Sequence, residues 1–222
     1  TYSLEGSGVK KSGELPAIKC PAGGITDAGT IQIPLDFVKQ AIGMQLTVTQ
    51  DGISNQYPVW VYPLSTPVCP DTIYETKVLD EKAVQILKDG GKVYLSPEAE
   101  KEHLPQSIRT QFTTDFWSVG TFAAQEGGMG QLIDEKHPIF RHFPTEFHTN
   151  WQWWPMASQR AIIFPHSVKA IVTEMDSYAY MRPMAQLAEF RCGGGKLIVS
   201  SMGLQNLQEY PEGRALLDAV YR

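Results

Sequence analysis

Hydrophobic and polar positions alternate along MQLTVTQ (44–50), a pattern typical of a strand with one buried face. The next stretch, DGISN (51–55), is rich in residues that favour turns, and QYPVWVYP (56–63) is a second aromatic and β-branched run. These two runs predict a β-hairpin. IQIPLDFV (31–38) predicts one more strand, which Pro34 would confine to a sheet edge because proline has no backbone N–H.

A strand, a helix and a second strand are predicted between residues 72 and 96. TIYETKVL (72–79) has the composition of a short strand. DEKAVQILKDGG (80–91) has apolar residues at helical spacing, with Asp80 as an N-cap and two glycines to end the helix. KVYLS (92–96) is again strand-like. Such a strand–helix–strand unit implies parallel strands, because a helical crossover returns the chain to the same end of the sheet.

The last third of the chain adds further elements. RAIIF (160–164) and KAIVTEM (169–175) are predicted strands. MAQLAEFRC (184–192) and KLIVSS (196–201) enclose a run of glycines, which predicts a hairpin or a closely spaced strand pair. PEGRALLDAVYR (211–222) predicts a final helix, since proline is favoured in a first helical turn.

Composition narrows the classes of protein and partner. The chain has 222 residues, of which 42% are hydrophobic and 19% charged, so it can bury a core. Its net charge is −5 and no basic stripe is present, which argues against a nucleic-acid partner. No apolar run approaches the ~18–20 residues of a membrane span, and the start lacks a signal-peptide pattern. The chain begins abruptly with TYSLEGSGVKK, which suggests an excised fragment or a processed chain.

Three cysteines, Cys20, Cys69 and Cys192, are too few and too far apart for a zinc knuckle or a dense disulfide framework. A single bridge between Cys20 and Cys69 is left open, and the compartment cannot be read from so few thiols.

Several stretches carry a resemblance to known families. DEKAVQILKDGGKVYLS (80–96), DEKHPIFRHFPTEFHTNWQWW (134–154) and LAEFRCGGGKLIVSSMGL (187–204) resemble the α/β domain of the class I glutamine-amidotransferase-like or ThuA-like kind. NQYPVWVYP (55–63) resembles the closing strand of the β-sandwich that precedes this domain in some family 2 glycoside hydrolases of the β-galactosidase type.

The resemblance implies a partial β-sandwich over residues 1–70 and a flavodoxin-like parallel sheet, with helices on both faces, over residues 71–222. It also implies an accessory role beside catalysis that is carried elsewhere, and a periplasmic or secreted location. The catalytic carboxylates of such hydrolases belong to a barrel of ~250 residues, which this chain is too short to contain in addition.

No residue constellation predicts catalysis. Ser96 stands where an amidotransferase-like nucleophile would, but its SPEAE context lacks the glycines of a sharp turn and instead predicts a helix N-cap. Cys192 is interpreted as a small buried apolar residue. Glu174 and Asp176 lie near a strand end and Glu189 lies in the next strand, and charged residues at strand ends are more often solvated than part of a catalytic pair.

Metal and cofactor sites are not predicted either. His137, His142, Glu146 and His148 lie within twelve residues, but two prolines interrupt them and they do not form a helical HExxH motif. Surface or interface contacts are therefore expected of these side chains. The glycine runs do not match a phosphate-binding loop, so no nucleotide cofactor is expected.

The tryptophan cluster is the strongest candidate for binding. Trp151, Trp153 and Trp154 stand beside His148 and Asn150, residue types that suit stacking on a sugar and hydrogen bonding to its hydroxyls. Packing in the core or between domains is the favoured interpretation and carbohydrate contact the alternative.

The three rings are expected to have two roles. Pro155 disfavours a helical conformation for Trp154, so an extended or turn geometry is expected, with Trp151 and Trp153 on one face and Trp154 on the other. The chain's other two tryptophans, Trp60 and Trp117, are expected in the core.

The sequence thus favours a non-catalytic accessory region of a carbohydrate-active protein, whose partners are the other domains of that protein and a glycan. An independent ThuA-like or amidotransferase-like hydrolase and a pure assembly module are the alternatives. An enzyme would need a nucleophile–base pair in a polar pocket, a sugar binder would need exposed rings, and an assembly module would need those rings in a broad apolar patch.

Overall fold

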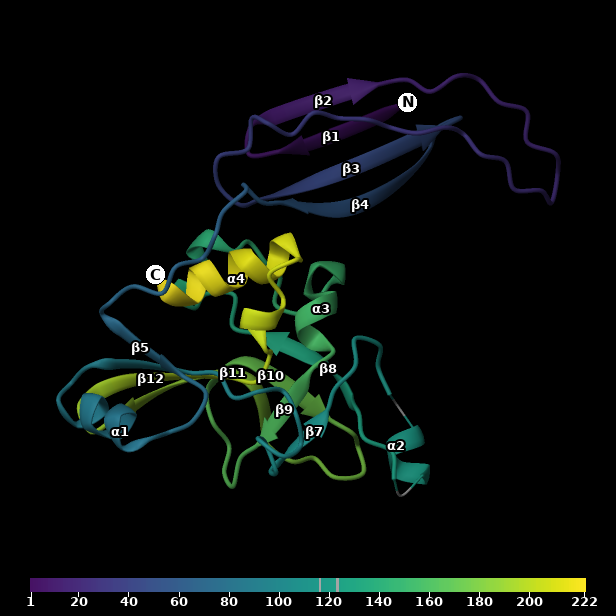
Figure 1. Cartoon of the computed structure of the whole chain (residues 1–222). Helices are drawn as coiled ribbons and strands as arrows, with labels where there is room; N and C mark the ends of the chain where they lie inside the picture. The colour runs from purple at the N-terminus through teal and green to yellow at the C-terminus, as the bar shows by residue number, and fades with distance from the viewer. Residues whose placement is uncertain (116, 123) are drawn as a thin grey trace. The chain divides into compact units, whose positions relative to one another are not determined.

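The computed structural model describes residues 1–115, 117–122 and 124–222 (Figure 1). Its internal contacts divide the chain into a first unit, Thr1–Pro63, and a second unit, Leu64–Arg222. The sequence placed the division after residue 70. Each unit has a sheet and a core of its own.

The first unit is one antiparallel sheet with the strand order β2-β1-β3-β4. The predicted hairpin is confirmed, because β3 and β4 pair along their whole length up to Gln50 and Ile53. Between them, Asp51 and Gly52 have φ angles of 50° and 82°, as a two-residue turn with positive φ at both positions requires. The four strands are β1 (Tyr2–Gly6), β2 (Val9–Gly13), β3 (Ile42–Gln50) and β4 (Ile53–Val61).

The layer that covers this sheet is irregular chain rather than a second sheet. Val38, from the segment between β2 and β3, is buried against Leu4 and Met44 of the strands. The strand predicted at residues 31–38 is therefore wrong, and so is the partial β-sandwich, since residues 1–63 contain a single sheet. The apolar residues of this segment pack against the sheet without joining it.

The second unit begins with the predicted strand–helix–strand unit. Strand β5 (Ile73–Thr76) and strand β6 (Lys92–Leu95) pair in parallel, and helix α1 (Glu81–Lys88) connects them. Asp80 caps α1 by accepting a hydrogen bond from the Ala83 N–H over 2.7 Å. These predictions are confirmed. Each of them depends only on interactions between residues that are close in sequence.

The sheet that grows from this unit is mixed, with the order β5-β6-β12-β11-β10-β8 and with β9 and β7 attached beside β11. Among the strand pairs of the described residues, only β5–β6 and β6–β12 are parallel, and the others are antiparallel. The six further strands are β7 (Ser107–Arg109), β8 (Gly128–Ile133), β9 (Arg160–Ile163), β10 (Ala170–Asp176), β11 (Met184–Cys192) and β12 (Gly195–Ser200).

This sheet contradicts the predicted flavodoxin-like fold. The chain is mostly β, with 33% strand and 17% helix, whereas a parallel flavodoxin-like sheet needs a crossover helix between successive strands. Here β11 turns directly into β12 at Gly193 and Gly194, and β10 is joined to β11 by a loop, so these neighbours are antiparallel. The prediction was wrong because it assumed that the whole sheet repeats the one strand–helix–strand unit with which it begins.

The remaining helical segments are short, apart from the last helix. They are α2 (Ser118–Thr121), η1 (Pro138–His142), η2 (Trp151–Trp153), α3 (Trp154–Ala157), η3 (Leu204–Asn206) and α4 (Pro211–Tyr221), where η marks a 3-10 helix. None of the helices in the described residues is long and apolar enough to span a bilayer.

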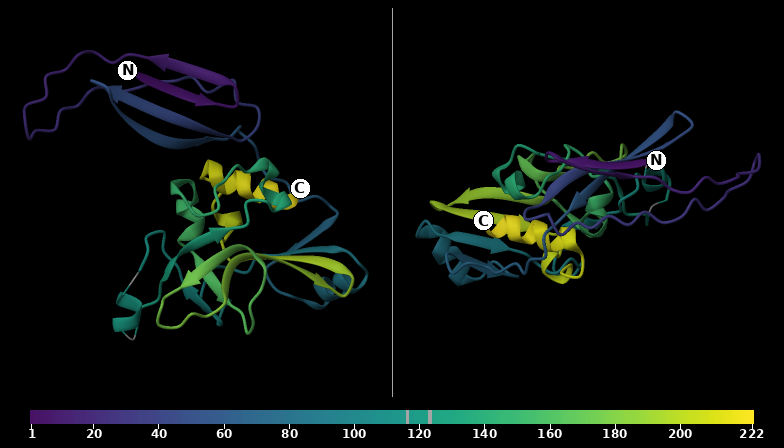
Figure 2. Two further views of the ribbon diagram at one scale, coloured as in Figure 1. Left: turned by 180° about the vertical axis from the view of Figure 1, so that it is seen from behind. Right: turned by 90° about the horizontal axis from the view of Figure 1, so that it is seen from above.

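Helices α1 and α4 cover opposite faces of the parallel strands (Figure 2). Successive side chains of a strand point to opposite faces, so Val93 and Tyr94 of β6 face different helices. Val93 packs with Ala83 and Leu87 of α1. Tyr94 lies edge-on to Tyr221 of α4, with ring centroids 5.9 Å apart.

Candidate functional site

The tryptophan cluster is helical rather than extended. Trp151–Trp153 forms the 3-10 turn η2, and α3 starts at Trp154. Asn150 caps the turn, with its Oδ1 accepting a hydrogen bond from the Trp151 N–H over 2.7 Å. The expectation that Pro155 keeps Trp154 out of a helix is wrong, because Pro155 occupies the first turn of a helix, where its missing N–H is not needed.

Trp153 belongs to the core of the second unit. Its side chain is fully buried, and its ring lies edge-on to Phe140 and Phe143 at centroid distances of 6.1 and 5.4 Å. Its indole N–H donates a hydrogen bond of 2.9 Å to Thr145 Oγ1, which satisfies its polar atom. This ring is therefore unable to meet a ligand at the surface.

Trp154 is the ring of the cluster that lines a pocket. It is 58% exposed, and its ring centroid lies 5.3 Å from that of Phe112 at an interplanar angle of 54°. Trp151 is 50% exposed but does not line this pocket. Burial therefore separates one inward ring from two outward ones.

We call the cavity beside Trp154 the aromatic pocket. Its volume is about 390 Å³, within the range of small-ligand sites. It is lined by Arg109, Thr110, Gln111, Phe112, Thr113, Gln125, Glu126, Trp154 and Ser158.

The polar lining of the aromatic pocket is partly fixed and partly open. Glu126 Oε2 accepts a hydrogen bond of 2.7 Å from the Arg109 backbone N–H and lies 3.4 Å from Arg160 Nη2. By contrast, the Arg109 guanidinium and the hydroxyls of Thr113 and Ser158 have no hydrogen bond or ion pair with any residue that the structure describes. The pocket thus combines exposed ring faces with donors and acceptors that a ligand rich in hydroxyl groups could use.

A buried polar chain lies beneath the aromatic pocket. Thr110 donates its hydroxyl hydrogen to Ala157 O over 2.6 Å and accepts a hydrogen bond of 2.8 Å from Gln186 Nε2. The same amide nitrogen is 3.4 Å from Glu174 Oε2, and Gln131 also donates to that carboxyl group. Burial raises the pKa of Glu174 to about 8, so the group is largely protonated at neutral pH.

The predicted solvated carboxylates at the end of β10 are therefore wrong. Glu174 is only 1% exposed. Asp176 forms two parallel hydrogen bonds with the Arg182 guanidinium, at 2.7 and 3.0 Å. Burial alone would raise the pKa of Asp176, but its hydrogen bonds to Arg182 and to the Ser177 N–H bring the pKa below its usual range.

His148 and Asn150 lie outside the aromatic pocket. Asn150 Nδ2 donates a hydrogen bond of 3.0 Å to Glu146 Oε2, and His148 Nε2 is 3.9 Å from the same oxygen. The tertiary structure thus gathers these two residues around Glu146 and not around Trp154. No three His, Cys, Asp or Glu side chains in the described part of the chain are placed to hold a metal ion.

Ser96 has a structural partner in place of its predicted role. No helix follows it, so the predicted N-cap is wrong. Its buried hydroxyl donates to Gln205 Oε1 over 2.8 Å, and an amide is no general base. The cysteines, Cys20, Cys69 and Cys192, are free thiols.

Trp117 was expected in the core, but it is 58% exposed, so this expectation is wrong. Trp60 is half-buried on β4. Among the pocket residues that the sequence did not single out, Arg109 ends the short strand β7 and Phe112 follows it. Only a local signal, an aromatic residue among polar ones in RTQFTT (109–114), marks that stretch.

Comparison with known families follows the division into two units. The chain belongs to the family described as a domain of unknown function (DUF8487), whose model matches residues 74–222. A second model, also described as a domain of unknown function (DUF8488), matches residues 1–63. No curated protein matches the chain. Because neither description states a function, the resemblance to family 2 glycoside hydrolases stays a prediction.

Proposed function

We propose that this member of the DUF8487 family is a non-catalytic, carbohydrate-contacting accessory region and that the aromatic pocket is its glycan site. The observation that carries the proposal is the position of Trp154, whose exposed ring stands with Phe112 in the wall of a polar pocket. The ring faces suit the C–H surface of a sugar, and the polar lining suits its hydroxyl groups.

The pocket is also held in place before a ligand arrives. Trp154 stands at the start of α3, where Pro155 fixes the backbone, and Thr110 is bonded to Ala157 and Gln186 beneath it. Glu126 is held by the Arg109 N–H. Side chains that are already ordered lose less conformational entropy when a ligand binds. This favours the binding of a ligand that is only weakly hydrophobic, such as a sugar.

The test is calorimetric titration of the full chain with a panel of neutral oligosaccharides of different linkages. Trp154→Ala is expected to weaken the affinity for the best ligand about tenfold or more, which corresponds to the loss of about 1.4 kcal/mol of stacking. Trp151→Ala is the matched control, since this ring is exposed to a similar extent and does not line the pocket. It should leave the affinity within about twofold of the wild type.

Two results would reject this proposal. One is the lack of saturable binding to any oligosaccharide, and the other is an equal loss of affinity in both tryptophan variants. Melting curves of the two variants show that a loss of binding does not arise from unfolding.

We propose no hydrolytic role for the two carboxyl groups of β10, those of Glu174 and Asp176. Both oxygens of Asp176 are engaged by Arg182, and Glu174 is buried under Gln131 and Gln186. We expect no turnover of aryl glycosides by the chain. Turnover that is lost in Glu174→Gln or Asp176→Asn would show that a reaction does take place there.

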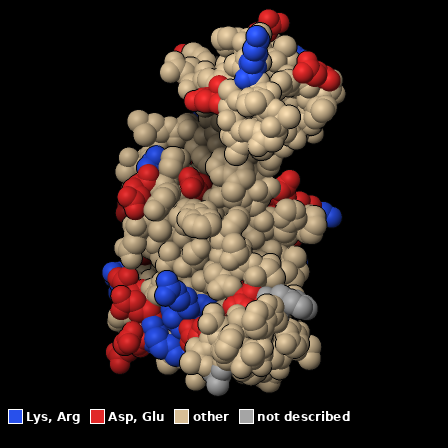
Figure 3. Space-filling view, turned by 90° about the vertical axis from the view of Figure 1, so that its right-hand side faces the viewer, with Lys and Arg blue, Asp and Glu red and all other residues tan. Residues whose placement is uncertain are grey.

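A second candidate function is docking onto another domain of a longer protein. The observation that favours it is an exposed aromatic group at α2, where the rings of Trp117 and Phe122 lie 6.1 Å apart. Tyr178 lies against the same helix, because a Cβ added to Gly120 would be 2.8 Å from its hydroxyl. Charged side chains gather beside this segment rather than on it (Figure 3).

Hydrogen exchange can separate docking from glycan binding. We expect the amides of residues 117–122 to exchange more slowly in a longer protein that carries the chain than in the chain by itself, and oligosaccharides to leave them unchanged. Equal exchange in both proteins would rule out docking through α2.

A further inference from the structure

A second cavity of the second unit has a different chemistry, and we call it the basic pocket. It lies on the α4 face of the sheet, beside the first residues of β6 and β12 and against η1, and its volume is about 310 Å³. It is lined by Ile73, Lys92, Val93, Tyr94, His137, Pro138, Ile139, Arg141, His142, Glu189, Lys196, Ile198, Ala219, Val220 and Arg222. None of these residues lines the aromatic pocket.

The charges around the basic pocket are not balanced. Glu189 supplies the one carboxylate side chain of the lining and is paired with Lys196 at 3.1 Å, while Arg222 is paired with Asp218 at 2.8 Å. Lys92 and Arg141 have no carboxylate partner within 4.0 Å in the part of the chain that the structure describes. In a chain of net charge −5, two unpaired cations in one cavity mark a place for a negative group.

His137 adds a neutral donor to this lining. The Ile139 N–H points to its Nδ1 at 3.4 Å, so the ring hydrogen of the neutral tautomer is on Nε2, which lies 3.8 Å from Glu189 Oε2. Burial holds the pKa of His137 below its usual value, although Glu189 opposes that shift. At neutral pH this side chain therefore provides hydrogen bonding without charge.

The floor of the basic pocket is apolar. Tyr94 and Ile198 project from neighbouring parallel strands, and Ala219 and Val220 close the cavity from α4. The ring of Tyr94 is fixed by the edge-on contact with Tyr221. A ligand that fills this space needs a compact apolar body as well as an anionic group.

We propose that the basic pocket binds a small organic anion, a carboxylate or phosphate ester on a compact aromatic or aliphatic body. The anionic group lies between Lys92 and Arg141, where the guanidinium can form paired hydrogen bonds with it. The apolar body lies over Tyr94 and Ile198. The site differs from the glycan site in both position and ligand chemistry, so either can fail without the other.

The experiment is calorimetric titration of the full chain with benzoate, phenyl phosphate, inorganic phosphate and the neutral analogue benzyl alcohol. We expect saturable binding of benzoate or phenyl phosphate, and the stronger of the two identifies the preferred anion. Benzyl alcohol and inorganic phosphate should each bind about tenfold more weakly, because benzyl alcohol lacks the anionic group and inorganic phosphate lacks the apolar body.

Charge-removing variants locate the site. Arg141→Gln and Lys92→Gln should each weaken binding of the preferred anion about tenfold. Lys88→Gln is the matched control, because Lys88 is exposed in the last turn of α1 and does not line the pocket. Trp154→Ala should leave the anion affinity unchanged.

Three outcomes would overturn the proposal. They are the absence of saturable binding by both organic anions, equal affinity for benzyl alcohol and for the anions, and an equal loss in the Lys88 and Arg141 variants. Because Lys92 and Arg141 are both exposed, their variants are expected to fold, and melting curves check this.

Discussion

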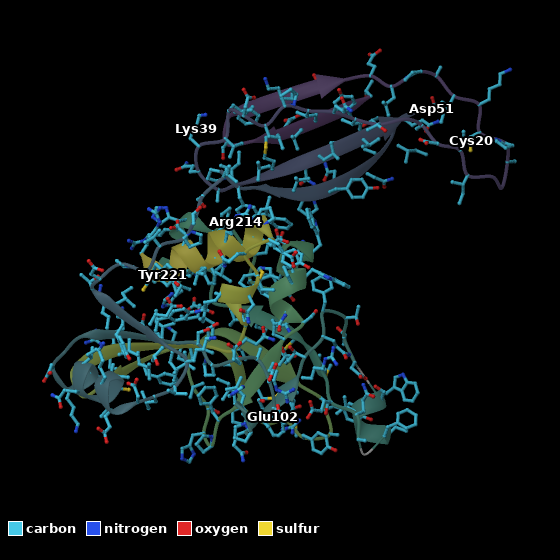
Figure 4. All side chains as sticks on the ribbon, viewed as in Figure 1. Cys20, Lys39, Asp51, Glu102, Arg214 and Tyr221 are labelled. Atoms are coloured by element: carbon cyan, nitrogen blue, oxygen red, sulfur yellow. The ribbon has the colours of Figure 1, made fainter. Side chains whose placement is uncertain are left out.

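The hydroxyl of Tyr221, a residue of α4 that Figure 4 labels, donates a hydrogen bond of 2.9 Å to Glu75 Oε2. This bond ties the last turn of α4 to β5, the first strand of the second unit. The other oxygen of Glu75 accepts a hydrogen bond of 2.6 Å from Gln205, whose Oε1 receives the hydroxyl hydrogen of Ser96. Burial, together with Glu75, raises the pKa of Tyr221 above its usual range, so the hydroxyl keeps its hydrogen at neutral pH. Side chains far apart in sequence thus form one polar network beside the parallel strands.

Removal of the Tyr221 hydroxyl should destabilise the second unit. Tyr221→Phe deletes the donor and leaves a half-buried carboxylate oxygen without its partner, which should cost about 1–3 kcal/mol of unfolding free energy. Urea denaturation of the full chain measures this loss. Tyr210→Phe is the control, since the Tyr210 hydroxyl has no hydrogen bond to any described residue. Identical denaturation midpoints for both variants would show that the network adds nothing to stability.

Stability should fall as the pH rises through the weakly acidic and neutral range, because of Glu174. The folded chain holds a proton on Glu174 up to about pH 8, whereas the unfolded chain releases it near the ordinary glutamate pKa of 4.5. Between these values the folded state binds more protons, so its stability decreases with increasing pH. This group contributes a loss of about 3–5 kcal/mol at most.

Glu174→Gln should flatten this dependence, because an amide resembles the protonated acid at every pH. Urea midpoints between pH 5 and pH 9 give the measurement. Glu135→Gln, at an exposed position, should keep the wild-type slope. If the slope in Glu174→Gln equals that of the wild type, Glu174 is ionised when buried and the assigned direction of its pKa shift is wrong.

The three clustered tryptophans should differ in their effect on stability. Trp153→Ala opens a large cavity beside Phe140 and Phe143 and should cost about 3–5 kcal/mol. Trp151→Ala and Trp154→Ala remove rings that are already half in water, so each should cost about 1–2 kcal/mol. Chemical denaturation of all three variants tests this order. Three equal losses would contradict the separation into one inward and two outward rings.

Gly195, the first residue of β12, should tolerate no side chain. A Cβ there would lie 2.5 Å from Gly91 O and 2.7 Å from Leu87 O, and both are backbone atoms that cannot rotate away. Gly195→Ala should therefore cost about 1–3 kcal/mol through displacement of α1. At Gly127, the control, the nearest atoms are side-chain atoms at 3.3 Å, so Gly127→Ala should cost less. A larger loss at Gly127 would contradict this account.

Elements that depend on neighbouring residues could be predicted from the sequence. Asp80 and the glycines after α1 define the helix between them, because a cap and a stop act within one turn. The β3–β4 hairpin follows from Asp51 and Gly52 in the same way. Of the residues that line the aromatic pocket, Trp154 is the one that the sequence singled out, because it belongs to a cluster of three tryptophans.

Other features depend on residues that the sequence separates widely. Trp153 and Trp154 are adjacent, yet contacts with Phe140 and Phe112 decide that one is buried and the other lines a pocket. The sequence predicted that Glu174 is a solvated residue at a strand end. In the structure, Gln131 of β8 and Gln186 of β11 surround it.

The sequence by itself determined the local helices, hairpins and turns, the acidic net charge and the concentration of aromatic surface after residue 146. Only the tertiary structure decided the mixed direction of the second sheet and the convergence of Arg109 and Trp154 on one pocket. It also placed Lys92 and Arg141 in one cavity. The reason is physical, because caps and turns act over a few residues, whereas burial, strand partners and charge balance depend on which distant segments pack together.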